Sequence, residues 1–96
     1  MKRKVIRYNG HGYEVEFFAM KDAAWASQQH QSGKVTMIAL NNAHPMFAGT
    51  RAQKLEAAAQ QVALQIAVRE MKKRGKRRIE DAIALASKIY ADRIKR

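Results

Sequence analysis

Residues 72–78 read Lys72-Lys73-Arg74-Gly75-Lys76-Arg77-Arg78, and this run decides how the second half of the chain folds. Apolar residues recur at helical spacing on both sides of it, a pattern typical of two amphipathic helices. Gly75 tolerates the left-handed conformation that ends a helix, so the first helix is predicted to stop at about Arg74. Residues 49–96 are therefore predicted to form a helical hairpin with the basic run at its corner.

The first of these helices is predicted to begin at Thr50-Arg51-Ala52-Gln53, which matches a capping box. One apolar stripe of this helix comprises Leu55, Ala58, Ala59, Val62 and Ile66. The opposite side carries Leu64, Val68 and Met71. A helix that is apolar on two sides contacts two surfaces: one is expected to be the sheet, and the other is the last helix or a second subunit. We expect a homodimer whose interface contains Leu64, Val68 and Met71. The last helix has a single stripe, formed by Ile79, Ala82, Ile83, Ala86, Tyr90 and Ile94.

The first half of the chain, residues 1–48, is predicted to form the sheet. A strand at Lys4–Tyr8 is followed by Asn9-Gly10, a strong hairpin signal, and then by alternating apolar and charged residues typical of a half-buried strand. Lys34–Leu40 is the third predicted strand, apolar on both faces. For residues 20–31 a short helix followed by a turn is considered. The chain is thus expected to be one α+β domain, residues 1–96, with a small antiparallel sheet packed against two long C-terminal helices.

Composition limits the classes of partner. The 96 residues carry a net charge of +11, with +3 in residues 1–48 and +8 in residues 49–96. Such a charge favours nucleic acid, an anionic membrane or an acidic protein surface as the partner. The chain has no Cys, which excludes disulfides and Cys-ligated zinc, and no apolar run approaches the ~18 residues of a membrane span. A cytoplasmic protein, in a bacterial cell or a virus-infected host, is expected.

The basic run is the main candidate binding site. Lys72, Lys73 and Arg74 close a helix, where cations are favourable, but Lys76, Arg77 and Arg78 open the next helix, where the dipole disfavours them. An unfavourable arrangement suggests that the charges serve a partner, and all six are predicted to contact a nucleic-acid phosphate backbone. A solvated turn and an acidic protein partner remain open alternatives. Lys88, Arg93, Lys95 and Arg96 are candidates for an extension of this basic surface.

The function favoured by these observations is that of a small basic binding protein without enzymatic activity. Its contacts with nucleic acid, DNA or RNA, are expected to have little sequence specificity, because few short polar side chains are available to read bases. The alternative is a protein-interaction module, or a phage-type inhibitor that docks an acidic surface of a host protein.

Catalytic and metal-binding patterns are weak. His11, His30 and His44 stand in separate turn-like segments without the spacing of metal ligands, so no metal and no cofactor are expected. A nuclease site built from His30, Asn41 or Asn42, and His44 is conceivable, but its spacing is not diagnostic.

One stretch resembles a known family. Val35-Thr36-Met37-Ile38-Ala39-Leu40-Asn41-Asn42-Ala43-His44-Pro45-Met46-Phe47 is a strand ending in Leu-Asn, followed by His-Pro, an aromatic residue and a long helix. This order resembles a distal segment of phage and bacterial histidine-kinase-like ATPase proteins. The family's nucleotide-binding Asn helix and Gly-rich boxes have no counterpart here. The resemblance therefore implies a packing or dimerisation segment, and it does not imply ATP binding.

Overall fold

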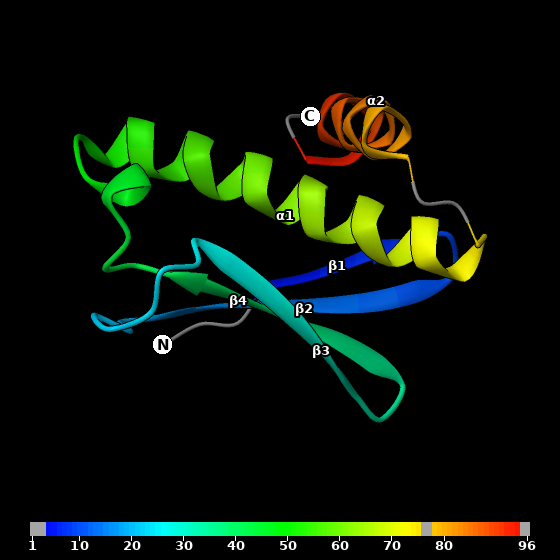
Figure 1. Cartoon of the computed structure of the whole chain (residues 1–96), viewed down its shortest axis with the longest axis horizontal. Helices are drawn as coiled ribbons and strands as arrows, with labels where there is room; N and C mark the ends of the chain where they lie inside the picture. The colour runs from blue at the N-terminus through cyan, green and yellow to red at the C-terminus, as the bar shows by residue number, and fades with distance from the viewer. Residues whose placement is uncertain (1–3, 76–77, 95–96) are drawn as a thin grey trace.

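The computed structural model describes residues 4–75 and 78–94, apart from the side chain of Arg93. Within these residues the strands come first and the helices follow (Figure 1). In chain order the elements are β1 (Lys4–Tyr8), β2 (His11–Phe18), β3 (Ser27–Ser32), β4 (Val35–Asn41), the 3-10 helix η1 (Pro45–Phe47), α1 (Arg51–Lys73), α2 (Ile79–Ile89) and the π-helical turn η2 (Tyr90–Ile94). The predicted α+β class is confirmed.

The sheet of the described residues has four strands in the order β1-β2-β4-β3. Two antiparallel hairpins, β1–β2 and β3–β4, make up its halves. The first turn is the predicted one, because Asn9 and Gly10 have positive φ angles of 53° and 78°. The hairpins meet through β2 and β4, which run parallel. The sheet therefore has one strand more than predicted, and it is mixed rather than wholly antiparallel.

The additional strand, β3, lies where the sequence suggested a turn. Its residues, SQQHQS, lack the apolar alternation typical of a strand. Polar contacts with α1 hold it instead: Gln29 Nε2 donates to the Oε1 and the backbone carbonyl of Gln65, both at 2.7 Å, and Ser27 Oγ donates to Gln61 Oε1. The short helix considered for residues 20–26 does not form. That segment is an irregular crossover from β2 to the edge strand β3.

The side chain of Asn41, at the end of β4, holds this crossover in place. Asn41 is fully buried, and its Oδ1 accepts hydrogen bonds from the backbone N–H groups of Met20 and Ala43 at 2.9 and 3.1 Å. Its Nδ2 donates to the carbonyls of Met20 and Trp25 at 3.0 and 3.1 Å. Because an amide both donates and accepts, one side chain satisfies several backbone groups that lie outside the strand ladder.

Both helices lie on the same face of the sheet (Figure 1). Val62 and Ile66 of α1 are buried in one cluster with Tyr13, Ile38 and Leu40 from the two central strands. Both belong to the stripe predicted to face the sheet, and Ala58 of that stripe is buried in the same cluster. The first residue of the stripe, Leu55, is instead 52% exposed.

The predicted ends of α1 are also confirmed. Thr50 Oγ1 accepts from the backbone N–H of Gln53 at 3.2 Å, and Gln53 Oε1 accepts from the backbone N–H of Thr50 at 2.9 Å, which completes the capping box. Gly75 follows the helix with a φ of 73°, in the left-handed region that ends helices.

α2 packs along α1, but its apolar stripe is only partly covered. Ile89 is fully buried, whereas Ile79 and Ile83, which open the predicted stripe, are 74% and 57% exposed. The second apolar side of α1 lines clefts beside α2, so it contacts the last helix, one of the two neighbours considered from the sequence. Its residues are Leu64, Val68 and Met71.

Candidate functional site

Segments that are distant in the sequence meet at one end of the molecule, on the right of Figure 1. They are the β1–β2 turn at residues 9–10, the last turn of α1 and the start of α2. The β3–β4 turn at residues 33–34 lies at the same end of the sheet, because Val35 pairs in parallel register with Gly12. Exposed cations lie in or beside each of these segments. We call this surface the basic end; its described members are Arg7, Lys34, Lys72, Lys73, Arg74 and Arg78.

A buried carboxylate holds the basic end together. Glu70 is only 1% exposed, and its Oε1 accepts a hydrogen bond from Asn9 Nδ2 at 3.2 Å. Arg69 Nη1 lies 3.4 Å from its Oε2, and Arg74 Nη2 lies 3.7 Å from its Oε1. These partners compensate a charge that would be costly to bury alone. Glu70 thus joins the β1–β2 turn to the end of α1, although the two are about sixty residues apart in the sequence.

Two of the predicted binding residues remain open to a partner. Lys72 and Lys73 are exposed in the last turn of α1, where the cations complement the helix dipole. Among the described residues, no carboxylate lies within ion-pair distance of either ammonium group.

Two others are partly engaged within the chain. Arg74 caps α1 and pairs with Glu70, while Arg78 precedes α2 and pairs with Glu80 at 3.6 Å. Both side chains of the second pair are largely exposed, so water screens it and it opposes another ligand only weakly. The remaining predicted contacts, Lys76 and Arg77, lie outside the described residues.

The positive charge extends to the sheet below α1. Arg69 lies over the ring of Tyr13, with its guanidinium carbon 5.9 Å from the ring centroid and Nη1 3.5 Å from Tyr13 Oη. Burial is the largest cause that lowers the pKa of the neighbouring His11, and the charges of Arg69, Lys73 and Arg7 lower it further. Burial likewise raises the pKa of Tyr13 above its ordinary value. The charge of Glu70 acts on the pKa of His11 in the opposite direction, so His11 lies where the charges of β1 and α1 overlap.

His11 also has a defined hydrogen-bond partner. Its Nε2 lies 2.8 Å from Thr36 Oγ1, which in turn donates to Gln31 Oε1 at 3.1 Å. Because the threonine proton is used toward Gln31, the neutral imidazole donates from Nε2 to the hydroxyl. This chain of bonds connects β2, β4 and β3 beneath the end of α1.

The other two histidines lie elsewhere. His30 is exposed on β3, and His44 Nδ1 accepts from the backbone N–H of Met46 at 3.1 Å, which caps η1. Asn41, considered with them as a nuclease site, uses its amide to hold the crossover. In residues 4–75 and 78–94, no three His, Asp or Glu side chains are grouped so that they could hold a metal ion.

The remaining predicted residues are spread over the molecule. Lys88 is exposed in the last turn of α2, while the side chain of Arg93, together with Lys95 and Arg96, lies outside the described part. Leu64, Val68 and Met71, the predicted dimer residues, border α2 of the same chain. A single chain does not test the dimer, which stays a prediction.

Comparisons with protein-family models, curated proteins and solved structures found no match to this chain. None of the helices in the described part of the chain combines the length and the apolar character needed to cross a bilayer.

Sequence reasoning did not identify Asn9, Arg69 or Glu70 as parts of this site. A signal for Glu70 was present, since Val62, Ile66 and Glu70 follow one another at intervals of four residues on the buried stripe. A carboxylate in such a position requires a buried partner. The identity of that partner, the turn at Asn9, depends on the tertiary fold.

Proposed function

We propose that this protein is a small binding module without enzymatic activity that contacts the phosphate backbone of nucleic acid through its basic end. One observation carries the proposal: exposed cations from several chain segments gather at one end, where Glu70 is buried beneath them and the exposed Glu80 pairs only with Arg78 among the described residues. Phosphates that approach this end would meet ammonium and guanidinium groups before they meet Glu70. Neutralising phosphates releases bound counterions, which supplies most of the affinity of such contacts.

The aromatic residues at this end, Tyr13 and the partly buried Tyr8, pack in or against the core, which favours backbone contact over recognition of bases. Tyr13 is fully buried under Arg69, so its ring is not available to stack on a base. The first turn of α2 carries Glu80 and Asp81, whose charges disfavour the entry of that helix into a groove of the nucleic acid. Binding is therefore expected to depend on charge and shape, with little dependence on sequence.

The rigid support beneath the cations also favours binding. The bond from Asn9 to Glu70 links the β1–β2 turn with α1, and the pairing of Arg74 with Glu70 orients the helix end. Cations that are positioned before the ligand arrives lose less conformational freedom on binding.

The test compares two double variants of equal charge. Lys72→Gln/Lys73→Gln removes two cations of the basic end. Lys21→Gln/Arg51→Gln removes two exposed cations from the β2–β3 crossover and the start of α1, segments that lie at the opposite end of the molecule (Figure 1). Affinity for labelled duplex DNA, single-stranded DNA and duplex RNA is measured by fluorescence anisotropy at several salt concentrations. An unrelated second sequence of each kind controls for sequence preference.

The first variant should lose roughly tenfold in affinity for each contact at ~0.1 M salt, and its plot of log affinity against log salt should flatten by roughly 2. The second variant should bind nearly as the unmodified protein does. Equal losses in the two variants would show only a general effect of net charge. That result, or an affinity of the unmodified protein that ignores salt, would refute the proposal.

A further inference from the structure

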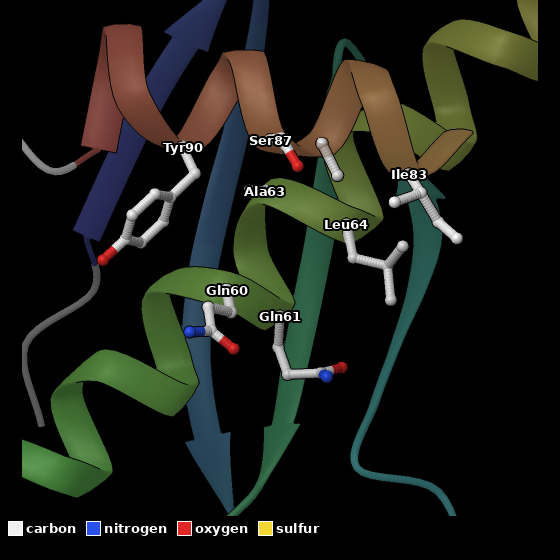
Figure 2. A pocket seen from close by; sticks show the side chains of 8 residues that line it. Gln60, Gln61, Ala63, Leu64, Ile83, Ser87 and Tyr90 are labelled. Atoms are coloured by element: carbon white, nitrogen blue, oxygen red, sulfur yellow. The ribbon is translucent and has the colours of Figure 1, made fainter. Parts of the chain in front are cut away.

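An apolar groove follows the seam between α1 and α2. It consists of two successive clefts with volumes of about 370 and 480 Å³. Figure 2 shows the first cleft, with Leu64 on α1 and Ile83 on α2 at one end and Gln60 and Tyr90 toward the other. The second cleft continues toward the corner between the helices and is lined by Val68, Met71, Lys72, Gly75, Arg78, Ile79 and Ala82.

Several apolar residues along the groove are left exposed by the rest of the chain. Ile79 and Ile83 are 74% and 57% exposed, and both belong to α2, which forms one side of the groove. Isolated exposed apolar residues are ordinary, but a row of them beside a cleft marks an interaction surface. The row is continued across the seam by Leu64 and Val68, which are only partly buried.

The geometry of the row fits a third helix. Leu64, Val68 and Lys72 are spaced by four residues along α1, and Ile79 and Ile83 are spaced by four residues along α2. Two such ridges form a channel that receives the apolar side chains of an amphipathic helix at positions i, i+3, i+4 and i+7. The lining residues of α1 extend over roughly 18 Å, which corresponds to about three turns of a docked helix.

The charges at the groove identify the kind of helix. Among the described residues, the charged side chains that line it are those of Lys72 and Arg78, both at the corner end. A second copy of the chain, which would form the homodimer expected from the sequence through Leu64, Val68 and Met71, would bring no carboxylate among the described lining residues to pair with these cations, and it would add a second net charge of +11. Self-association is disfavoured by such repulsion. An amphipathic helix with carboxylates beside its apolar stripe matches both the apolar lining of the groove and the cations at its corner end.

We infer that the seam between α1 and α2 binds an acidic amphipathic helix of another protein. Apolar side chains of that helix pack between Leu64, Val68, Ile79 and Ile83, and its carboxylates face Lys72 and Arg78. The surface differs from the one that contacts phosphates at the basic end, although Lys72 and Arg78 belong to both.

The experiment uses the full chain and a displayed library of acidic helical peptides about four turns long. Apolar positions at helical spacing vary among Leu, Ile, Met and Phe on a Glu-rich framework. The selected peptide is labelled, and its affinity is measured by fluorescence anisotropy against three proteins: the unmodified chain, Ile79→Ser/Ile83→Ser, and Val5→Ser. Val5 is 60% exposed on β1, away from both helices, and serves as the matched control. A scrambled peptide has the same charge without an apolar stripe.

Ile79→Ser/Ile83→Ser should weaken peptide binding by roughly tenfold or more for each isoleucine, since each loses its contact with apolar surface. The Val5→Ser variant and the scrambled peptide separate this effect from general apolar and charge contacts. Duplex affinity should be unchanged in Ile79→Ser/Ile83→Ser, so failure of this inference is distinguishable from failure of nucleic-acid binding. Three results would overturn the inference: the library yields no binder, the scrambled peptide binds equally, or sedimentation shows a dimer that Ile83→Glu dissociates.

Discussion

Replacing Glu70 with Gln tests how the basic end is held together. The carboxylate is 1% exposed and has Asn9, Arg69 and Arg74 as partners at 3.2, 3.4 and 3.7 Å. Glutamine has nearly the same shape, so the change removes the charge and adds an N–H donor while the packing is kept. The free energy of unfolding should fall because the charge-assisted contacts weaken and the new donor faces two guanidinium groups.

The size of the loss follows from the individual contacts. A hydrogen bond to a charged group contributes about 1.5–3 kcal/mol, and a neutral one about 0.5–1.5 kcal/mol, so the Asn9 bond should weaken by about 1 kcal/mol. The half-exposed Arg74 pair adds about 0.3–0.5 kcal/mol, and the Arg69 pair adds up to ~1 kcal/mol. Together these give about 2 kcal/mol. In a domain of this size that corresponds to a decrease in Tm of roughly 8–16 °C.

Urea and thermal unfolding followed by far-ultraviolet circular dichroism measure the loss. Glu80→Gln is the matched control, because Glu80 is 75% exposed and its 3.6 Å pair with Arg78 should contribute less than ~0.5 kcal/mol. Asn9→Gly removes the amide and keeps the positive φ of the turn. In that background Glu70→Gln should cost about 1 kcal/mol less. Equal effects of Glu70→Gln and Glu80→Gln, or no coupling to Asn9, would contradict the role assigned to the buried carboxylate.

Two further substitutions have matched controls in the chain. Asn41→Ala should lower the free energy of unfolding by about 3 kcal/mol, because several backbone groups of the crossover lose their partner, whereas the exposed Asn42→Ala should change it by less than ~0.5 kcal/mol in urea unfolding. For His11 the folded pKa is lowered, so the unfolded chain binds the proton more tightly; stability should fall as pH decreases from about 6.5 through the lowered pKa. His11→Gln should remove this part of the pH dependence and the exposed His30→Gln should not, and a pH profile that is the same in all three proteins would contradict it.

The second half of the chain was predicted closely because its signals are local. The capping box at Thr50 and Gln53, the stripe through Val62 and Ile66, and the stop at Gly75 each depend on residues within one or two helical turns. Such features are set by backbone geometry and by spacing along the chain, and the tertiary structure leaves them unchanged.

The first half was predicted less well because two of its features depend on distant partners. The polar strand β3 forms because Ser27 and Gln29 bond to Gln61 and Gln65 of α1. The parallel pairing of β2 with β4 follows from the crossover that Asn41 holds. Neither strand propensity nor apolar alternation contains this information, since side-chain hydrogen bonds here replace apolar burial.

The candidate site was also predicted only in part from the sequence. The charged run at residues 72–78 is visible in the sequence, and four of its six cations lie within the described residues, exposed at the corner as expected. The contributions of Arg7 and Lys34, and the buried link through Asn9 and Glu70, were not visible.

By itself the sequence determined the α+β class, both ends of α1 and the concentration of positive charge at the turn between the helices. These properties follow from composition and from spacings shorter than about two helical turns. The tertiary structure alone decided that the β1–β2 turn and the corner between the helices lie at one end of the molecule. It also decided that Ile79 and Ile83 of α2 stay exposed. The physical reason is that contacts between distant segments depend on how the sheet and the helices pack, and no short stretch of residues contains that arrangement.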